Sequence, residues 1–250
     1  MATTSVAVPD TPLIRLALAR ADDALVLGHR LSEWTGHAPT LEEDLALANI
    51  ALDLIGQARS LYALAGEDCG LDEDALAYRR DERAYRNLLL VEQPNGDFAR
   101  TIVRQFLYAA FIDAWWQAMT ASCEPRLAAI AGKAEKETAY HLRHSAEWLI
   151  RLGDGTAESH RRAQAALDAL FPFAAEMFEP VTAAAFDVAP ASLREGWDRQ
   201  VDAVLATAGL TRPAAPWSHS GGRAGRHTEH LGHLLSEMQY LQRVHPGATW

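Results

Sequence analysis

Apolar residues recur with helical spacing through most of this chain. Over about 12–34, leucine and alanine return every three, four or seven residues, which marks one face of a helix. Over about 40–65 apolar residues occupy most of the helical circumference, a pattern typical of a helix inside a bundle. Two more long apolar-patterned stretches follow at about 98–122 and 125–152. The first part of the chain therefore predicts four long helices.

The connection between the second and third predicted helices is the longest in this region. Residues 67–97 include a short helical piece near 72–78, a charged run at 79–83 and a turn at 93–96. A long crossover distinguishes ferritin-like bundles from simple up-down bundles. We therefore expect an all-α fold, a ferritin-like four-helix bundle with its long crossover between helices 2 and 3 and additional C-terminal helices.

The remaining residues predict a helical extension packed on this core. Helices are expected at about 157–178, bent before Pro172, at 192–209 and at 228–244, with a loop at 211–225. Two capping-box patterns, one at 40–43 and one at 192–195, predict where two helices begin. We expect a single domain over 1–250, with its core at about 12–152 and its extension at about 156–250.

Charge and cysteine content narrow the class of protein. The net charge is −10 and the isoelectric point is about 5.4, so a phosphate backbone would be repelled and nucleic acid is not an expected partner. No apolar stretch approaches the roughly 18 residues of a membrane span, so no membrane partner is expected. Cys69 and Cys123 stand alone, and residues 1–9 lack the basic start of a signal peptide. These features predict a cytoplasmic protein.

Long bundles of this kind often hold two iron or manganese ions. Such a site needs one carboxylate from each of two helices and a Glu-x-x-His pair from each of the other two. None of the ten histidines here has an acid three residues before it. The second helix reads DLIGQ at 53–57, the third has the single acid Asp113, and the fourth has Glu137 four residues before His141. We therefore predict neither a di-iron centre nor a catalytic residue in this chain.

Weaker candidates for a metal site remain in two places. One is a mononuclear zinc or iron site at 227–233, although a helix start with locally paired side chains explains the same residues. The other is the fourth helix, where hydrogen bonds across the bundle are the favoured alternative. The candidate ligands are His141, His144, His227, Glu229, His230 and His233.

Three further patterns have two interpretations each. The aromatics around Trp115 and Trp116 favour a packed core over a ligand tunnel. The charged run at 79–83 favours a solvated face over a partner surface. The glycine-rich segment 221–226 lacks the Walker spacing, which favours a flexible loop over a phosphate site.

Seven stretches spread over nearly the whole chain carry a family resemblance. They are LSEWTGHAP at 31–39, DLALANIALDLIGQAR at 44–59, RDER at 80–83, NLLLVEQPNG at 87–96, YHLR at 140–143, TEHLG at 228–232 and EMQYLQR at 237–243. They resemble the PaaC subunits of bacterial phenylacetyl-CoA 1,2-epoxidase. The stretch NLLLVEQPNG and the two C-terminal stretches are specific to that family.

The resemblance implies a ferritin-like fold and a role in a complex that uses O2 and NADPH to epoxidise the ring of phenylacetyl-CoA. It implies that iron and substrate belong to a PaaA-like catalytic subunit, and that this chain holds no cofactor and scaffolds that subunit. It also implies that the complex is completed by a reductase and by a small bridging subunit. Alone, the chain is expected to form a homodimer. We expect the outward faces of the first two helices to carry much of the contact, with Arg30, Glu33 and Trp34 as members.

Two other functions compete with this one. The chain could be a divergent ferritin-like metal-dependent oxidase or oxygenase, with ligands drawn from His141, His144, Glu229 and His230. It could also be a stand-alone homodimeric binding protein. Metal content and association with a PaaA-like chain distinguish the three.

Overall fold

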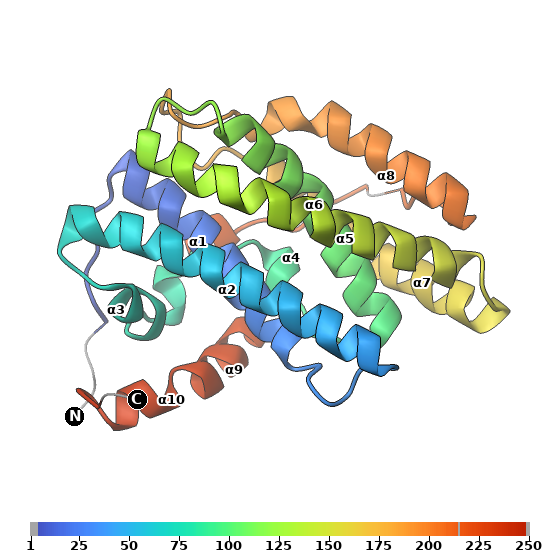
Figure 1. The fold of residues 1–250 in the computed structure, drawn as a ribbon, viewed down its shortest axis with the longest axis horizontal. Coiled ribbons are helices and arrows are strands. Elements are labelled where there is room, and N and C mark those ends of the chain that lie inside the picture. The colour runs from blue at the N-terminus through green and yellow to red at the C-terminus, as the bar shows by residue number, and fades with distance from the viewer. Residues whose placement is uncertain (1–4, 215, 249–250) are drawn as a thin grey trace.

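The computed structural model describes residues 5–214 and 216–248, so part of the segment 1–9 considered above lies outside the described residues. Over these ranges the chain is all-α and contains no strand. The four long helices run side by side as a ferritin-like bundle (Figure 1). They are α1 (Pro12–Ser32), α2 (Leu41–Cys69), α5 (Phe98–Met119) and α6 (Pro125–Gly153).

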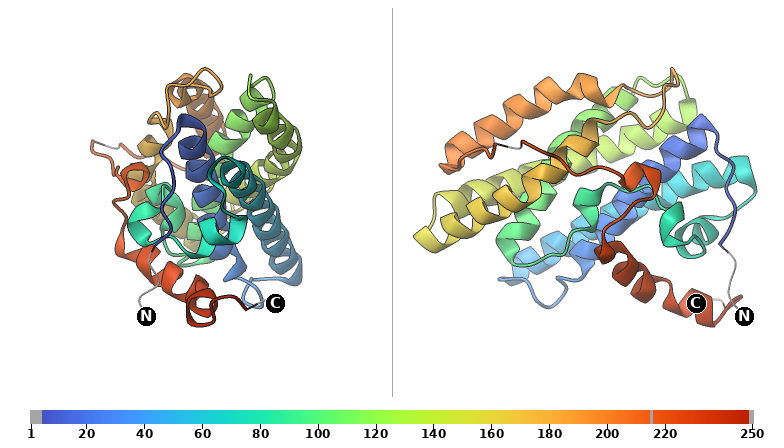
Figure 2. Two further views of the ribbon diagram at one scale, coloured as in Figure 1. Left: turned by 90° about the vertical axis from the view of Figure 1, so that its left-hand side faces the viewer. Right: turned by 180° about the vertical axis from the view of Figure 1, so that it is seen from behind.

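Helix α1 lies at the centre of the molecule. Every residue from 16 to 28 is buried, including the charged ones. It packs along α2, as α5 packs along α6, and these two pairs make the most extensive helix contacts (Figure 2). Gly28 allows this close approach, because a Cβ there would lie 3.2 Å from the carbonyl oxygen of Ala51 on α2. Since α1 has no outward face over 16–28, that part of it cannot offer the partner contacts expected of the first helix.

The predicted long crossover between the second and third bundle helices is confirmed. It contains α3 (Glu73–Tyr78), the 3-10 turn η1 (Glu82–Ala84) and the one-turn helix α4 (Leu89–Glu92). The carboxylate of Asp72 accepts a hydrogen bond from the Ala75 N–H at 2.7 Å and so begins α3.

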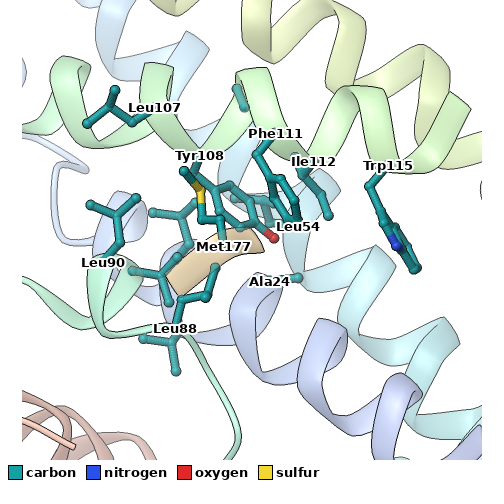
Figure 3. Close-up of a cluster of buried hydrophobic side chains, with 14 of the residues drawn as sticks. Ala24, Leu54, Leu88, Leu90, Leu107, Tyr108, Phe111, Ile112, Trp115 and Met177 are labelled. Carbon is teal, nitrogen blue, oxygen red and sulfur yellow. The ribbon is translucent and has the colours of Figure 1, made fainter. Parts of the chain in front are cut away.

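Apolar side chains fill the space between α1, α2, α4 and α5. Figure 3 shows Leu54, Tyr108, Phe111 and Met177 gathered there, with Leu88 and Leu90 beside them. One buried apolar cluster includes side chains from Ile14 near the start of the chain to Leu235 near its end. Core and extension therefore share one hydrophobic interior.

The extension lies on two sides of the bundle. Helices α7 (Ala157–Leu170) and α8 (Arg194–Ala208) pack on α5 and α6, joined by 3-10 turns η2 (Phe171–Phe178) and η3 (Pro190–Leu193). The predicted bend before Pro172 is confirmed, since the proline lacks the N–H that would continue α7. Helices α9 (Glu229–Met238) and α10 (Tyr240–Val244) lie at the opposite edge (Figure 1), and the turn η4 (Gly222–Ala224) precedes them in the chain.

Neither predicted capping box forms. The Thr40 side chain makes no cap bond, and the Glu43 carboxylate, which was expected to bind the Thr40 N–H in return, is engaged with His144 on α6. The Ser192 hydroxyl donates to the Ala189 carbonyl inside η3, and α8 begins only at Arg194. A reciprocal box instead begins α7 at Thr156. The helices of the described ranges include none with the length and apolar character needed to cross a membrane.

Candidate functional site

Two histidines of α6 bind acids of α2 across the seam where these helices face each other. Nε2 of His141 lies 3.0 Å from Oδ2 of Asp53, and Nε2 of His144 lies 2.9 Å from Oε2 of Glu43. Both imidazoles are largely buried. The predicted hydrogen bonds across the bundle are confirmed, and each histidine is paired with one carboxylate.

The other bundle acids considered as metal ligands also have partners within the chain, and Nζ of Lys133 lies 3.3 Å from Oε1 of Glu137. The Gln57 amide donates to the Glu137 carboxylate at 2.9 Å. Asp113 accepts hydrogen bonds from the Thr138 hydroxyl at 3.1 Å and from the Gln117 amide at 2.7 Å. Burial raises the pKa of Asp113, an effect that these two hydrogen bonds oppose.

Helix α1 contributes two adjacent acids, Asp22 and Asp23, that are completely buried. Asp22 forms an ion pair with Arg80 and accepts a hydrogen bond from the Tyr62 hydroxyl at 2.6 Å. Asp23 lies 2.7 Å from Nη2 of Arg223, which reaches it from the far end of the chain. Arginine side chains therefore neutralise the acids that α1 directs into the interior.

The charged run at 79–83 was expected to be solvated throughout, and this is wrong for Arg80. Its side chain is fully buried, whereas the other members of the run are exposed. The guanidinium reaches Asp22 and stacks over the Tyr85 ring, with 4.3 Å between its carbon and the ring centroid. Burial alone would lower the pKa of Arg80, but the charge and hydrogen bond of Asp22 outweigh it and raise the pKa.

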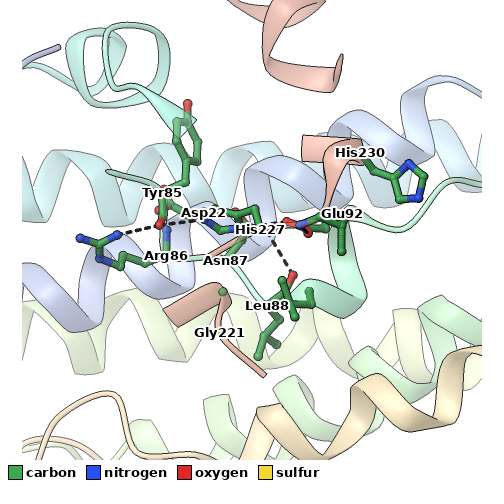
Figure 4. A network of polar contacts seen from close by, with 12 residues as sticks. Asp22, Tyr85, Arg86, Asn87, Leu88, Glu92, Gly221, His227 and His230 are labelled. Atoms are coloured by element: carbon green, nitrogen blue, oxygen red, sulfur yellow. Dashed lines mark hydrogen bonds and ion pairs between the residues drawn. The ribbon is translucent and has the colours of Figure 1, made fainter. Parts of the chain in front are cut away.

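The candidate metal cluster at 227–233 is dispersed by the fold. His227 turns inward and binds Glu92, with 3.0 Å between Nδ1 and Oε2 (Figure 4). Glu229 and His233 are exposed, and His233 lines a groove of about 540 Å³ between α1 and α9. His230 binds the chain through its backbone, since its carbonyl oxygen accepts a hydrogen bond from Arg30 at 3.3 Å.

Residues 5–214 and 216–248 contain no group of three or more His, Cys, Asp or Glu side chains arranged to hold a metal ion. A dinuclear site would require several carboxylates and two imidazoles around one shared position. Here the bundle acids considered above are each bound to an arginine, a lysine, a histidine, an amide or a hydroxyl. The donor set present does not fit a di-iron centre.

The glycine-rich segment forms a turn that binds an anion belonging to the chain itself. The N–H groups of Gly221 and Gly222 donate to Oε1 of the buried Glu176 at 2.9 and 2.7 Å, and the Leu89 N–H donates to Oε2 at 2.8 Å. A Cβ at Gly222 would lie 2.1 Å from the carbonyl oxygen of Asn87. The segment is thus a packed turn and not the flexible loop expected there.

The three interface candidates are held mainly by contacts within the chain. Arg30 is buried and donates to the Glu92 carbonyl at 3.2 and 2.9 Å and to the Glu33 carboxylate at 2.9 Å. The Trp34 indole donates to the Thr101 hydroxyl at 3.0 Å. Only Glu33 keeps substantial exposure of its side chain. Their role in an interface stays a prediction.

Trp115 and Trp116 belong to the core, as predicted. Both are essentially inaccessible to solvent. The Trp115 indole donates to Asp187 at 3.1 Å, and the guanidinium carbon of Arg20 lies 4.6 Å from the centroid of the Trp115 ring. This packing fills the region where a ligand tunnel was the alternative.

Sequence reasoning missed the acids around which α1, the crossover and the C-terminal segment meet. These are Asp22, Asp23, Glu92 and Glu176, all fully buried. Asp22 and Asp23 carried a signal, because they interrupt an otherwise apolar helix. The arginines that reach them, Arg80 and Arg223, lie 58 and 200 residues away in sequence. No local pattern indicated that these arginines would bind the two acids.

Comparisons with known proteins identify the family of this chain. The family model described as phenylacetic acid catabolic protein matches residues 1–250. A relative from Escherichia coli (strain K12), named as the C subunit of 1,2-phenylacetyl-CoA epoxidase, is 50% identical over 249 residues, which is 95% of this chain and 99% of the relative. Both the match over the full sequence and this identity show that the chain belongs to the phenylacetic acid catabolic protein family.

Proposed function

We propose that this chain is a non-catalytic structural subunit of a phenylacetyl-CoA 1,2-epoxidase complex, in which it scaffolds a PaaA-like di-iron subunit. The proposal is supported by the similarity to a protein named as the C subunit of that epoxidase. The observation that supports a non-catalytic role is that the interior acids are already bound to other side chains. Arg80 and Arg223 bind the acids of α1, and His141 and His144 bind those of α2.

Electrostatics supports the same conclusion. Arg20, Arg80 and Arg223 place three guanidinium groups in the interior beside α1. A cation repels a divalent metal ion strongly in a medium of low dielectric constant. Ligand carboxylates would also have to break their present ion pairs, which leaves buried arginines without partners. Such an interior supports a rigid bundle better than an oxygen-activating site.

The outward face of α2 is the surface we propose for the PaaA-like subunit. Leu41, Leu45 and Leu52 are 70, 56 and 66% exposed, and their spacings of four and seven residues place them in one stripe. Beside the stripe, Gly56 and Ser60 line a groove between α2 and α6. Small residues let a partner helix approach closely, and a lasting subunit interface commonly buries more than about 2,000 Å².

Reconstitution with a PaaA-like chain tests the proposal. We expect NADPH- and O2-dependent epoxidation of phenylacetyl-CoA only when both chains and the reductase are present. Leu45→Glu and Leu52→Glu should weaken co-purification at least tenfold without loss of helicity, because each buries a charge in the interface. Tyr240→Glu, at an exposed site on α10, is the matched control and should bind normally. Epoxidation by this chain without a PaaA-like subunit would contradict the proposal.

The compartment and the self-association of the chain follow from the same proposal. We infer a reducing cytoplasm as the compartment, since Cys69 and Cys123 are both free thiols. We also propose that the apolar stripe of α2 supports a homodimer when the PaaA-like subunit is missing. Sedimentation of wild type and Leu52→Glu checks this, since only the wild type should sediment as a dimer.

A further inference from the structure

The C-terminal strap, defined here as residues 221–243, fastens the crossover to the bundle. Its first residues bind Glu176 through their N–H groups. Its far end returns to the crossover, where the Gln239 amide donates to the Arg80 carbonyl at 3.1 Å, and Arg243 donates to the same oxygen at 3.1 Å. Between these ends, α9 contacts η1 (Figure 2). The strap thus closes over a segment more than a hundred residues earlier in sequence.

His227 lies in the middle of the strap, with its side chain fully buried. Nδ1 is 3.0 Å from the Glu92 carboxylate, and Nε2 is 3.1 Å from the Tyr85 carbonyl oxygen. Both neighbours can only accept from the ring, and Figure 4 shows the imidazole between them. A neutral imidazole has one N–H and would turn a lone pair toward one of these oxygens, whereas the imidazolium donates to both.

The surroundings of Glu92 favour its role as an acceptor. Its Oε1 receives the Thr228 N–H at 2.6 Å, and its Oε2 receives the Asn87 amide at 2.9 Å in addition to His227. Three donors thus converge on one buried carboxylate, and His227 of the strap is the one among them that can carry a charge.

The other charged groups around His227 are already balanced. Asp22 on α1 adds a favourable negative potential, and its direct partner is Arg80 of the crossover. Within the strap, Arg223 is paired with Asp23. Glu92 is thus the acid that His227 contacts directly.

We propose that a proton on His227 fastens the C-terminal strap and that the strap loosens when rising pH removes this proton. When Nδ1 or Nε2 loses its hydrogen, one contact changes from attraction to repulsion between lone pairs. Opening would occur at the middle of the strap, where α9 leaves the crossover.

The expected pH range follows from linkage. Burial alone would lower the pKa of His227, but Glu92 and the Tyr85 carbonyl outweigh it and raise the pKa above its usual 6.5. Stabilisation of the strap is therefore complete below about 6.5. It is lost as pH rises through the raised pKa, by up to about tenfold in the closing equilibrium per pH unit.

Hydrogen exchange of the full chain, measured from about pH 6 to 9.5 and corrected for intrinsic rates, tests the proposal. Amides of 221–243 should lose protection by up to about tenfold per pH unit above about pH 6.5, while those of α5 stay constant. His227→Gln keeps one donor but cannot become a cation, so its strap should be loose at every pH. His233→Gln, an exposed histidine of the same strap, is the control and should behave as wild type.

Nitrogen-15 NMR of the wild-type imidazole gives a second readout that needs no variant. We expect both ring nitrogens of His227 to carry hydrogen at pH 6, below the usual pKa of a histidine. A single neutral tautomer at that pH, or protection of 221–243 that does not change with pH in the wild type, would overturn the proposal.

Discussion

At the scale of single residues, the buried acids of α1 are each surrounded by donors. Asp22 receives the Arg80 guanidinium, the Tyr62 hydroxyl at 2.6 Å and the Arg86 N–H at 2.7 Å. Asp23 is bound in the same manner by a guanidinium and a backbone N–H. Since each buried charge has a matched partner, removal of one partner leaves the other uncompensated. We therefore expect these few buried ion pairs to have a large effect on the free energy of unfolding.

Removal of one member of the Asp22–Arg80 pair should be strongly destabilising. We expect Asp22→Asn and Arg80→Met each to lower the free energy of unfolding by roughly 3–5 kcal/mol, and the double variant to lose less than the sum. Urea unfolding followed by circular dichroism measures this. Arg161→Met, at an exposed ion pair on α7, is the control and should leave the midpoint almost unchanged. Equal effects of the buried and exposed variants would contradict this assignment.

At the scale of the elements, helix starts depend on where side chains find partners in three dimensions. Thr40 precedes α2 without making a cap bond, whereas the Thr156 hydroxyl accepts the Ser159 N–H at 3.1 Å and begins α7. Both threonines precede a helix and differ only in this contact. The difference gives a direct test within one chain.

We expect Thr156→Ala to lower the free energy of unfolding by about 1 kcal/mol through loss of the cap bond. Thr40→Ala should have a clearly smaller effect, because no bond is lost. Thermal unfolding of the two variants beside the wild type provides the comparison. If Thr40→Ala proved the more damaging substitution, the assignment of the caps would be wrong.

Glycine positions in the strap and in α6 predict opposite outcomes. Gly222→Ala would place a Cβ 2.1 Å from the Asn87 carbonyl oxygen, so we expect a loss of roughly 1–3 kcal/mol. Gly132 lies in α6, where an added Cβ would meet no atom within 4 Å, so Gly132→Ala should stabilise by about 0.5–1 kcal/mol. Denaturant midpoints measure both. The same sign for the two substitutions would count against the packing described.

Local pattern predicted the long helices, the crossover, the bend before Pro172 and the end of α8 at Gly209. It predicted these because helical periodicity, proline and glycine act within a few residues. It failed where partners are distant in sequence. Glu43 was predicted to complete a capping box, but its carboxylate binds His144. Arg80 was predicted to be solvated within a charged run, but its guanidinium binds Asp22. The histidine pairs of α6 were predicted as a type, although their partner acids were not.

At the scale of the whole molecule, the bundle combines a rigid interior with an apolar outer stripe. The interior acids are held by arginine, histidine, amide and hydroxyl groups, and α1 is buried between its neighbours. The stripe on α2 exposes three leucines to solvent. Both features support the proposed role of a subunit that contributes its surface, while another chain supplies the chemistry of the proposed complex.

Metal content tests this account most directly. The chain would be produced alone in iron-rich medium, and again with a PaaA-like subunit, and iron per polypeptide would be measured after gel filtration. The account predicts no stoichiometric iron in the chain alone and about two iron ions for each PaaA-like subunit in the complex. About two iron ions bound to the chain alone would contradict it.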